Sequence, residues 1–497
     1  MIAGRMLPEF RKWARTACLE AARQWMVRTL GIENPVTVPE LLIVTGHQPQ
    51  LNHAGVWMKN VATARLAECC GGQGVNLIVD NDLAGPSVLR VPSGTRDHPV
   101  LTEIPFDLPA PAQPWEEVSI QEKSLFENFG ERVSQAMSSW NIQPLIESMW
   151  PAAAQSAECD AGMVRALSAA RITQERAWHV RNLELPVSEL CRTEPFLAFV
   201  SHLCHHVEDF FTAYNSGVHA YRHKYRVRNA RHPVPDLEQQ GDRFELPFWY
   251  WEPGASDRQR VFVRREGRQI ELLAGEHLLA TLNSDDSDLS PLVDVQKKGR
   301  LRTRALTTTL FARLCLGDLF LHGIGGARYD EITNGLMASF FGIPCPGFIT
   351  LTATLHLPIE PFSVTNADLA RLKSEIRQLE FHGRTDSHDP AIAVLEERRR
   401  SLLQEIQRSR QERLSRDQWR TRRLENRQRH QELVRIQRLL AEEARPLRNE
   451  RLQELEQLRG ELRANSILKS REFSAALCPE SKLQSLIQHV RREICGR

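Results

Sequence analysis

Long apolar runs are absent from this 497-residue chain, and none approaches the roughly 20 residues that a membrane-spanning helix needs. The N-terminal segment is interrupted by charged side chains from Arg5 to Arg23, so it has no apolar stretch of the signal-peptide kind. Its pattern is that of an amphipathic helix. We therefore expect a cytoplasmic protein without a membrane partner.

Paired cysteines and excess charge are lacking as well. The ten cysteines form no CxxC pair and no compact framework of the disulfide-rich kind, so we expect reduced, mostly buried thiols. The formal net charge is only +2. General attraction to nucleic acid requires clustered excess charge, so we expect a small-molecule substrate and no nucleic-acid partner.

Two short apolar runs, each followed by a polar turn, give the first indication of the fold. Residues 41–44 end in the turn 45–50, and a helical pattern resumes over 55–70. Residues 75–79 then end in the acidic segment 80–82. Strand, turn, helix and strand predict a βαβ unit, and hence an α/β fold with a parallel sheet and a Rossmann-like polar site at its rim.

The turn after the first run gathers many polar groups where a helix begins. A helix N-terminus has unpaired N–H groups and a partial positive charge, which suit a phosphate or a carboxylate. Histidines there can stabilise developing charge or move protons. The structural alternative is that they cap the helix and hydrogen-bond to loop carbonyls. The candidate residues are His47, Gln48 and His53 for catalysis, and Thr45, Gly46 and Lys59 for substrate binding.

Asp80 and Asp82 follow the second apolar run. The carboxyl ends of neighbouring parallel strands meet at one edge of a sheet, so these carboxylates are expected near His47. Paired carboxylates can hold an amine, a ribose or a divalent cation, although an Asx-rich turn has the same local sequence. We take both as candidate catalytic residues.

A glycine turn at residues 323–326 follows another short apolar run. It lacks the Gly-Lys-Ser/Thr ending of a Walker loop, but it lets backbone approach a ligand closely. The basic run 297–304 precedes it and either closes over an anionic ligand or is a solvated loop. The candidate substrate-binding residues in these segments are Arg304, Gly325, Gly326 and Glu331.

Two further features receive structural interpretations. His202, His206 and Asp209 share one face of a predicted helix, but no second ligand cluster accompanies them, so we expect no metal site. The aromatic stretch 248–251 is read as strand and as core packing rather than as a base-stacking platform. Residues from about 85 to 290 are expected to be segments inserted into the core.

The composition changes sharply after residue 365. Residues 396–463 contain 19 Arg, 13 acidic residues and no Lys, and the chain has no Gly or Pro between positions 391 and 445. This pattern predicts a long helix, and the leucine spacings of 3 and 4 between 433 and 462 indicate a coiled-coil seam. We predict a core domain over 1–365 and an α-helical coiled-coil domain over 366–497.

In this order the blocks TGHQPQL, DND, LRTRALTTTLF and FLHGIGGARYDEI, followed by a coiled coil, resemble the BshC family, the cysteine-adding enzymes of bacillithiol synthesis. The resemblance spans roughly residues 41 to 497 in outline, with identity confined to the short blocks. His47 stands where the family pattern has Gln, and Ala327 stands where it has Pro.

The resemblance implies a nucleotidyltransferase-like Rossmann core and a coiled coil that forms a homodimer. It also implies a ligase that adds an amino acid, plausibly cysteine, to the amine of a small acidic sugar conjugate such as glucosaminyl-malate. The matching positions are Thr45, Gly46, His47, Gln48 and Leu51 in the first turn, Asp80 and Asp82 in the second, and Gly325, Gly326 and Glu331 in the last. Whether ATP or another nucleotide serves as a cofactor stays open.

Two other functions stay open from the sequence. One is a nucleotidyltransferase that acts on a sugar or cofactor phosphate, because the same core supports either chemistry. The other is a non-catalytic interaction protein whose arginine-rich coiled coil binds a partner or RNA through phosphate contacts. Pyrophosphate release would identify the first, and salt-dependent RNA binding the second.

Overall fold

The computed structural model describes residues 1–33, 39–255, 257–267, 269–283, 288–383, 389–411 and 415–495. The chain divides into two units. The first contains Met1–Ser93, Leu101–Pro358 and the segment that begins at Arg471, and the second contains Gly94–Val100 and Ile359–Ser470. The chain thus returns to the first unit at Arg471, within the stretch that the sequence had suggested is entirely coiled coil.

A parallel sheet forms the centre of the first unit. Its strands are β1 (Leu42–His47), β2 (Gln73–Ile78), β5 (Leu183–Pro186), β12 (Leu319–His322) and β13 (Phe348–Thr350). All four neighbouring pairs are parallel, in the spatial order β13-β12-β1-β2-β5. The predicted α/β class with a parallel sheet is therefore confirmed.

The order of these strands sets the position of the site. Numbered 1 to 5 along the chain, they lie in the order 3-2-1-4-5, so successive connections leave β1 toward opposite edges of the sheet. Ligands of such open sheets bind outside the carboxyl ends of the strands where the connections diverge. That point lies between His47, which ends β1, and His322, which ends β12.

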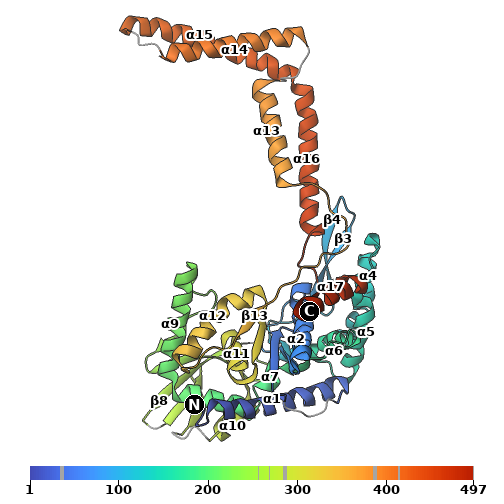
Figure 1. Cartoon of the computed structure of the whole chain (residues 1–497), viewed down its shortest axis with the longest axis vertical. Helices are drawn as coiled ribbons and strands as arrows, with labels where there is room; N and C mark the ends of the chain where they lie inside the picture. Colours follow the sequence, from blue (N-terminus) through green and yellow to red (C-terminus); the bar gives the residue numbers. More distant parts are fainter. Residues whose placement is uncertain are drawn as a thin grey trace. The chain divides into compact units, whose positions relative to one another are not determined.

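Helices pack on this sheet and join it to the inserted segments (Figure 1). Helix α2 (Ala54–Cys70) packs on β1 and β2, and α1 (Leu7–Leu30) packs on β5. The others that line or support the core are α5 (Leu145–Cys159), α6 (Met163–Ala177), α7 (Val187–Leu190), α8 (Glu194–His205), α9 (Val207–Tyr225), α11 (Ala305–Phe311), the π-helical turn η3 (Ala312–Leu316), α12 (Ile324–Ser339) and α17 (Glu480–Cys495).

A second, antiparallel sheet lies within the predicted insertion and extends beyond it. Its ordered path is β10-β9-β8-β7-β11, and β6 also pairs with β7. The strands are β6 (Gln239–Gln240), β7 (Arg243–Trp251), β8 (Gln259–Glu266), β9 (Gln269–Ala274), β10 (His277–Leu282) and β11 (Arg300–Thr303). The remaining elements are β3 (Val88–Gly94), β4 (Pro99–Pro105), η1 (Trp115–Glu117), α3 (Lys123–Glu127), α4 (Phe129–Ala136), η2 (Ser138–Trp140), α10 (Ser290–Lys298) and η4 (Ala475–Leu477).

The basic run 297–304 forms neither a solvated loop nor a lid. Residues 300–303 of this run are strand β11, and the Arg302 guanidinium is fully buried, where it forms a two-pronged ion pair with Glu116 at 2.8 Å. Arg300 pairs with Glu117 at 3.1 Å. Two carboxylates of η1, far away in sequence, therefore pair with the strand arginines of a run that looks solvent-exposed, while Lys297 remains exposed.

The second unit contains the helices α13 (Asn366–His382), α14 (Pro390–Gln411), α15 (Arg416–Glu443) and α16 (Arg445–Leu468). Helix α14 packs on α15, and α13 packs on α16 (Figure 1). The long helix predicted over this stretch is divided into α14, α15 and α16, and Arg398 pairs with Glu432 while Glu405 pairs with Arg429. Because the later residue of α14 pairs with the earlier residue of α15, the two helices are antiparallel. The predicted seam residues Leu433, Ile436 and Leu440 bury their side chains against α14.

Two further expectations can be compared with the described residues. Eight cysteines are free thiols, but Cys69 is disulfide-bonded, so the expectation of reduced thiols is wrong at that position. Within the described ranges, every helix is too short or too polar to cross a lipid bilayer.

Candidate active site

A cavity of about 1000 Å³ opens at the carboxyl ends of β1 and β12. Its walls come from the turn after β1, the segment after β2, the start of α12 and the antiparallel sheet. Nine of the twelve predicted site residues line it, namely Gly46, His47, Gln48, His53, Lys59, Asp82, Arg304, Gly325 and Gly326. Segments almost 280 positions apart in the sequence thus share one cavity.

His47 is held in a neutral form at the end of β1. Its Nε2 lies 3.1 Å from Asn60 Oδ1, and its Nδ1 lies 3.0 Å from the Gln48 carbonyl and 3.3 Å from Asn52 Nδ2. Burial, followed by the charges of Lys59 and Arg171, lowers the pKa of His47 to about 3. Both ring nitrogens face protein groups, so His47 suits a role as a neutral polar contact better than one as a proton acceptor.

The partner of His47 fixes its tautomer. Asn60 donates from Nδ2 to Glu175 Oε1 at 2.8 Å, which turns its Oδ1 toward the imidazole. His47 Nε2 therefore carries the hydrogen and donates it. Glu175 is itself buried and accepts from Trp57 at 2.7 Å and from Arg171 at 2.9 Å. This buried network of hydrogen bonds holds the His47 ring in one orientation.

His53 confirms the structural alternative for one of the two histidines. It is the N-cap of α2, and its Nδ1 accepts a hydrogen bond of 3.1 Å from the Gly55 amide. A side chain at Gly55 would lie 2.8 Å from the Ala353 carbonyl, so glycine permits this close approach. His53 lines the cavity, but its Nδ1 is already occupied by the hydrogen bond that caps α2.

Lys59 projects from the second turn of α2 and is almost fully buried. Its Nζ donates to the Gly46 carbonyl at 2.7 Å, and burial lowers its pKa to about 8. A backbone carbonyl offsets less charge than a carboxylate does. Lys59 is thus a cation in the cavity wall that can gain from an anionic ligand.

The two predicted aspartates face different surroundings. Asp82 lines the cavity, is half-exposed, accepts from Gln48 Nε2 at 3.3 Å and lies 3.8 Å from Arg258. Between them, Asn81 also lines the cavity and donates to the Thr303 carbonyl at 2.7 Å. Asp82 is therefore the carboxylate available to a ligand.

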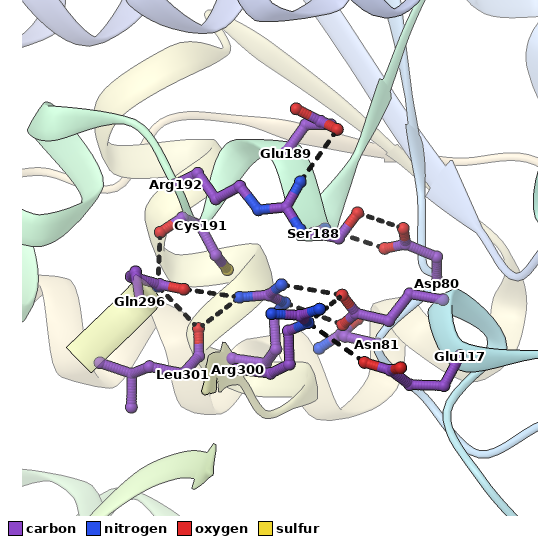
Figure 2. A network of polar contacts seen from close by, with 12 residues as sticks. Asp80, Asn81, Glu117, Ser188, Glu189, Cys191, Arg192, Gln296, Arg300 and Leu301 are labelled. Carbon is purple, nitrogen blue, oxygen red and sulfur yellow. Dashed lines mark hydrogen bonds and ion pairs between the residues drawn. The ribbon is translucent and has the colours of Figure 1, made fainter. Parts of the chain in front are cut away.

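Asp80 does not line the cavity, so the structure does not bring this predicted catalytic residue together with the other candidates. Its two oxygens bind the backbone N–H and the hydroxyl of Ser188, as Figure 2 shows, and its side chain is buried away from the cavity. Burial, followed by the nearby Glu116 charge, raises the pKa of Asp80 to about 7. Asp80 ties the end of β2 to the start of α7.

Thr45 and Glu331 also lie outside the cavity lining. The Thr45 hydroxyl donates to the Leu321 carbonyl at 3.0 Å, so it joins β1 to β12. Glu331 accepts from Lys224 at 2.7 Å and from the Tyr225 hydroxyl at 2.6 Å on the exposed side of α12. The last predicted binding residue of the glycine turn therefore belongs to a surface contact with α9.

The aromatic strand contributes one residue to the site that its core interpretation missed. Phe248, Tyr250 and Trp251 are buried as predicted, but Trp249 lines the cavity. Guanidinium carbons of Arg304 and Arg258 lie 4.1 and 4.9 Å from the centre of the Trp249 ring. This distance is that of cation–π contacts.

The two arginines differ in how their charge is compensated. Arg304 pairs with the buried Glu245 at 2.7 Å, whereas the only carboxylate close to Arg258 in the described residues is Asp82, at 3.8 Å. Burial lowers the pKa of Arg258, and the Asp82 charge only partly opposes this effect. An anionic ligand group therefore gains more from Arg258 than from Arg304.

His322 is the main functional candidate that the sequence prediction missed. It lines the cavity at the end of β12, and its Nε2 lies 2.8 Å from Asp330 Oδ2. The same carboxylate accepts from Arg313, which lies on the π-helical turn η3. A lone histidine in FLHGIGG gave no sign of these partners, although the spacing to Asp330 spans one strand end and two helical turns.

The cavity offers cations for anionic groups, a half-exposed carboxylate for an amine, and three histidines in different hydrogen-bonding states. Among the described residues, no group of three or more His, Cys, Asp or Glu side chains is arranged to hold a metal ion. No protein-family model and no curated protein matches the chain.

Proposed function

We propose that this protein is a BshC-like ligase with a Rossmann-like core. In this proposal it joins an amino acid, plausibly cysteine, to the amine of a small acidic sugar conjugate such as glucosaminyl-malate. One observation carries the proposal: the blocks on which the family resemblance depends, from TGHQPQL to FLHGIGG, contribute residues to one cavity where the 3-2-1-4-5 sheet changes direction.

The cavity has groups that match each part of such a substrate. Lys59 and Arg258 would bind the carboxylates of the acidic portion, because Lys59 is buried, the Arg258 side chain is only 14% exposed, and both cations have weak compensation. Asp82 would hold the ammonium group before reaction. Gln48 would donate a hydrogen bond to the oxygen that gains negative charge when the amine attacks the carboxyl carbon, and His47 would form a neutral polar part of the wall beside it.

The coiled-coil unit supports a proposal of homodimerisation. Trp419 and Leu424 on α15 are 57% and 64% exposed, which is unusual for large apolar side chains on a charged helix. We propose that a second copy of the chain covers these two side chains in the cytoplasm. Sedimentation equilibrium of the full chain and of Leu424→Glu tests this: a monomeric wild type contradicts it.

Mass spectrometry of the reaction mixture tests the enzymatic proposal. The purified protein is incubated with cysteine and glucosaminyl-malate, with and without ATP, and then with glucosamine as an amine that lacks carboxylates. We expect a condensation product from glucosaminyl-malate and little from glucosamine. Pyrophosphate formation without condensation would instead identify a nucleotidyltransferase, and no product with any amine would refute the ligase.

A further inference from the structure

The three cavity histidines differ in which ring nitrogen is available. Both nitrogens of His47 face protein groups, and His53 uses Nδ1 to cap α2. His322 uses Nε2 for Asp330, while its Nδ1 makes no hydrogen bond to any described residue. The lone pair of a neutral His53 faces the Gly55 N–H, so its Nε2 carries the hydrogen and can only donate. His322 is therefore the cavity histidine whose free nitrogen can accept a proton from a ligand.

Asp330 and Arg313 hold the ring of His322 in one orientation. Asp330 is buried, and Arg313 donates to the same Oδ2 that faces His322. Burial favours the protonated acid, but the hydrogen bond and charge of His322 and the charge of Arg313 outweigh it and lower the pKa of Asp330. An ionised Asp330 requires a hydrogen on Nε2, so the lone pair of a neutral His322 lies on Nδ1.

Glycine keeps that nitrogen uncovered. A Cβ atom at Gly326 would lie 2.9 Å from His322 Nδ1, closer than real Cβ contacts come. Gly326 lies in the first turn of α12 and itself lines the cavity. The ring also packs on Phe320 and Phe348, with centroids 4.4 and 5.3 Å away, so it has little freedom to turn aside.

We propose that His322 is the general base of this cavity and that Asp330 and Arg313 are its positioning residues. The proposal rests on the proposed function, in which the substrate amine must lose a proton before it attacks. Activation of a nucleophile needs a base that is held in one orientation. Here a buried carboxylate binds the second ring nitrogen of the base and holds it so.

Proton transfer to His322 precedes formation of the C–N bond. The Nδ1 lone pair of His322 takes one proton from the ammonium group of the acidic sugar conjugate, and His322 becomes an imidazolium that Asp330 stabilises. The amine nitrogen then forms the C–N bond with the carboxyl carbon of the amino acid, which a nucleoside triphosphate has activated as a mixed anhydride. The phosphate-bearing group leaves with the electron pair of the C–O bond and takes up the second proton that the nitrogen must lose to become an amide.

Charged and titratable groups from each neighbouring element bear on this proton transfer. Asp330 and Tyr329 come from α12, Arg313 from η3, and His47 from the adjacent strand β1. A neutral His322 is needed to accept the proton, so kcat/KM is expected to fall as the pH is lowered.

His322→Gln tests the base directly. Glutamine can keep a donor near Asp330 but has no basic nitrogen, so we expect kcat/KM to fall roughly 100- to 10,000-fold and the acid limb of its pH profile to disappear. His205→Gln is the matched control, because His205 lies on α8 outside the cavity lining, and the partners of its ring among the described residues are the Ser201 and Asn283 carbonyls and the Ser201 hydroxyl. An unchanged rate and pH profile in His322→Gln would overturn the proposal.

Gly326→Ala gives a second test that leaves every side chain of the relay in place. Its methyl group would cover Nδ1, and we expect at least a tenfold loss of kcat/KM. Gly335→Ala on the same helix meets nothing within 4 Å, so it should leave the activity unchanged without lowering the melting temperature. Equal activity of the two variants would contradict a role for the uncovered nitrogen.

Nitrogen-15 NMR of the histidine rings separates this proposal from the proposed function. If the wild type forms no product with any amine, the ligase fails, but the tautomer of His322 can still be read. We expect a hydrogen on Nε2 and a titrating lone pair on Nδ1 that Gly326→Ala shields from solvent. A hydrogen on Nδ1 in the neutral ring would refute the general base, whatever the substrate.

Discussion

Asp80→Asn is predicted to stabilise the protein near pH 8 and to leave turnover intact. In the wild type, burial, followed by the Glu116 charge, raises the pKa of Asp80 from 3.8 to about 7. Asparagine has the same shape: its Oδ1 can accept from the Ser188 amide, and its Nδ2 can donate to the Ser188 hydroxyl. The variant therefore removes a buried charge and keeps both hydrogen bonds.

The sign of the pH dependence follows from the raised pKa. Below about pH 4 the carboxyl is protonated in the folded and unfolded states, so wild type and variant should be equally stable. Between about pH 4 and 7 the unfolded state ionises first, and the wild type loses stability relative to the variant. At about 1.4 kcal/mol for each pH unit, the full difference reaches up to about 4 kcal/mol above pH 7.

Thermal denaturation from pH 5 to 8 measures this difference, with turnover followed in the same preparations. Asp82→Asn is the matched comparison, because Asp82 lies in the cavity and its loss should reduce turnover. A lower melting temperature of Asp80→Asn at pH 8, or a difference that does not grow with pH, would refute the reasoning. Loss of turnover in Asp80→Asn would return that residue to the chemistry.

Two further substitutions test the site and the second unit. His47→Gln should keep kcat within about threefold, because a neutral amide can replace the Nε2–H donor to Asn60; a loss comparable to that of His322→Gln would show that His47 moves a proton. Leu440→Ala should destabilise the second unit by roughly 2–5 kcal/mol, because the side chain is 1% exposed, and calorimetry should show the first unit's transition unchanged. A single transition that shifts as a whole would contradict the independence of the units.

The sequence predicted the rim of the sheet well because apolar runs of strand length end in polar turns. The strand-ending residues around His47 and Asp82 need only the βαβ rule to be brought together. The choice between Asp80 and Asp82 needs more, since it depends on Ser188, which lies 108 positions away. The local sequence does not indicate which of two neighbouring carboxylates forms hydrogen bonds to a residue so far away in the chain.

Other errors have the same physical origin. Arg302 looks solvent-exposed in a basic run, and only the carboxylate of Glu116 makes its burial possible. The arginine-rich tail has a composition that suits one long helix or an antiparallel pair equally well. The partners that make His322 a candidate catalytic residue, Arg313 and Asp330, are brought to it by the fold. Its own neighbours in sequence are glycine and apolar residues, which give no sign of such partners.

Calorimetric titration with glucosaminyl-malate tests most directly whether the cavity between β1 and β12 binds a small acidic amine. We predict one binding site per chain, and roughly 10- to 100-fold weaker binding by Arg258→Met, because a charged hydrogen bond contributes about 1.5–3 kcal/mol. Arg243→Met, which breaks an exposed pair with Glu276 outside the cavity, should bind like the wild type. No binding to the wild type, or equal binding by both variants, would contradict the assignment of this cavity.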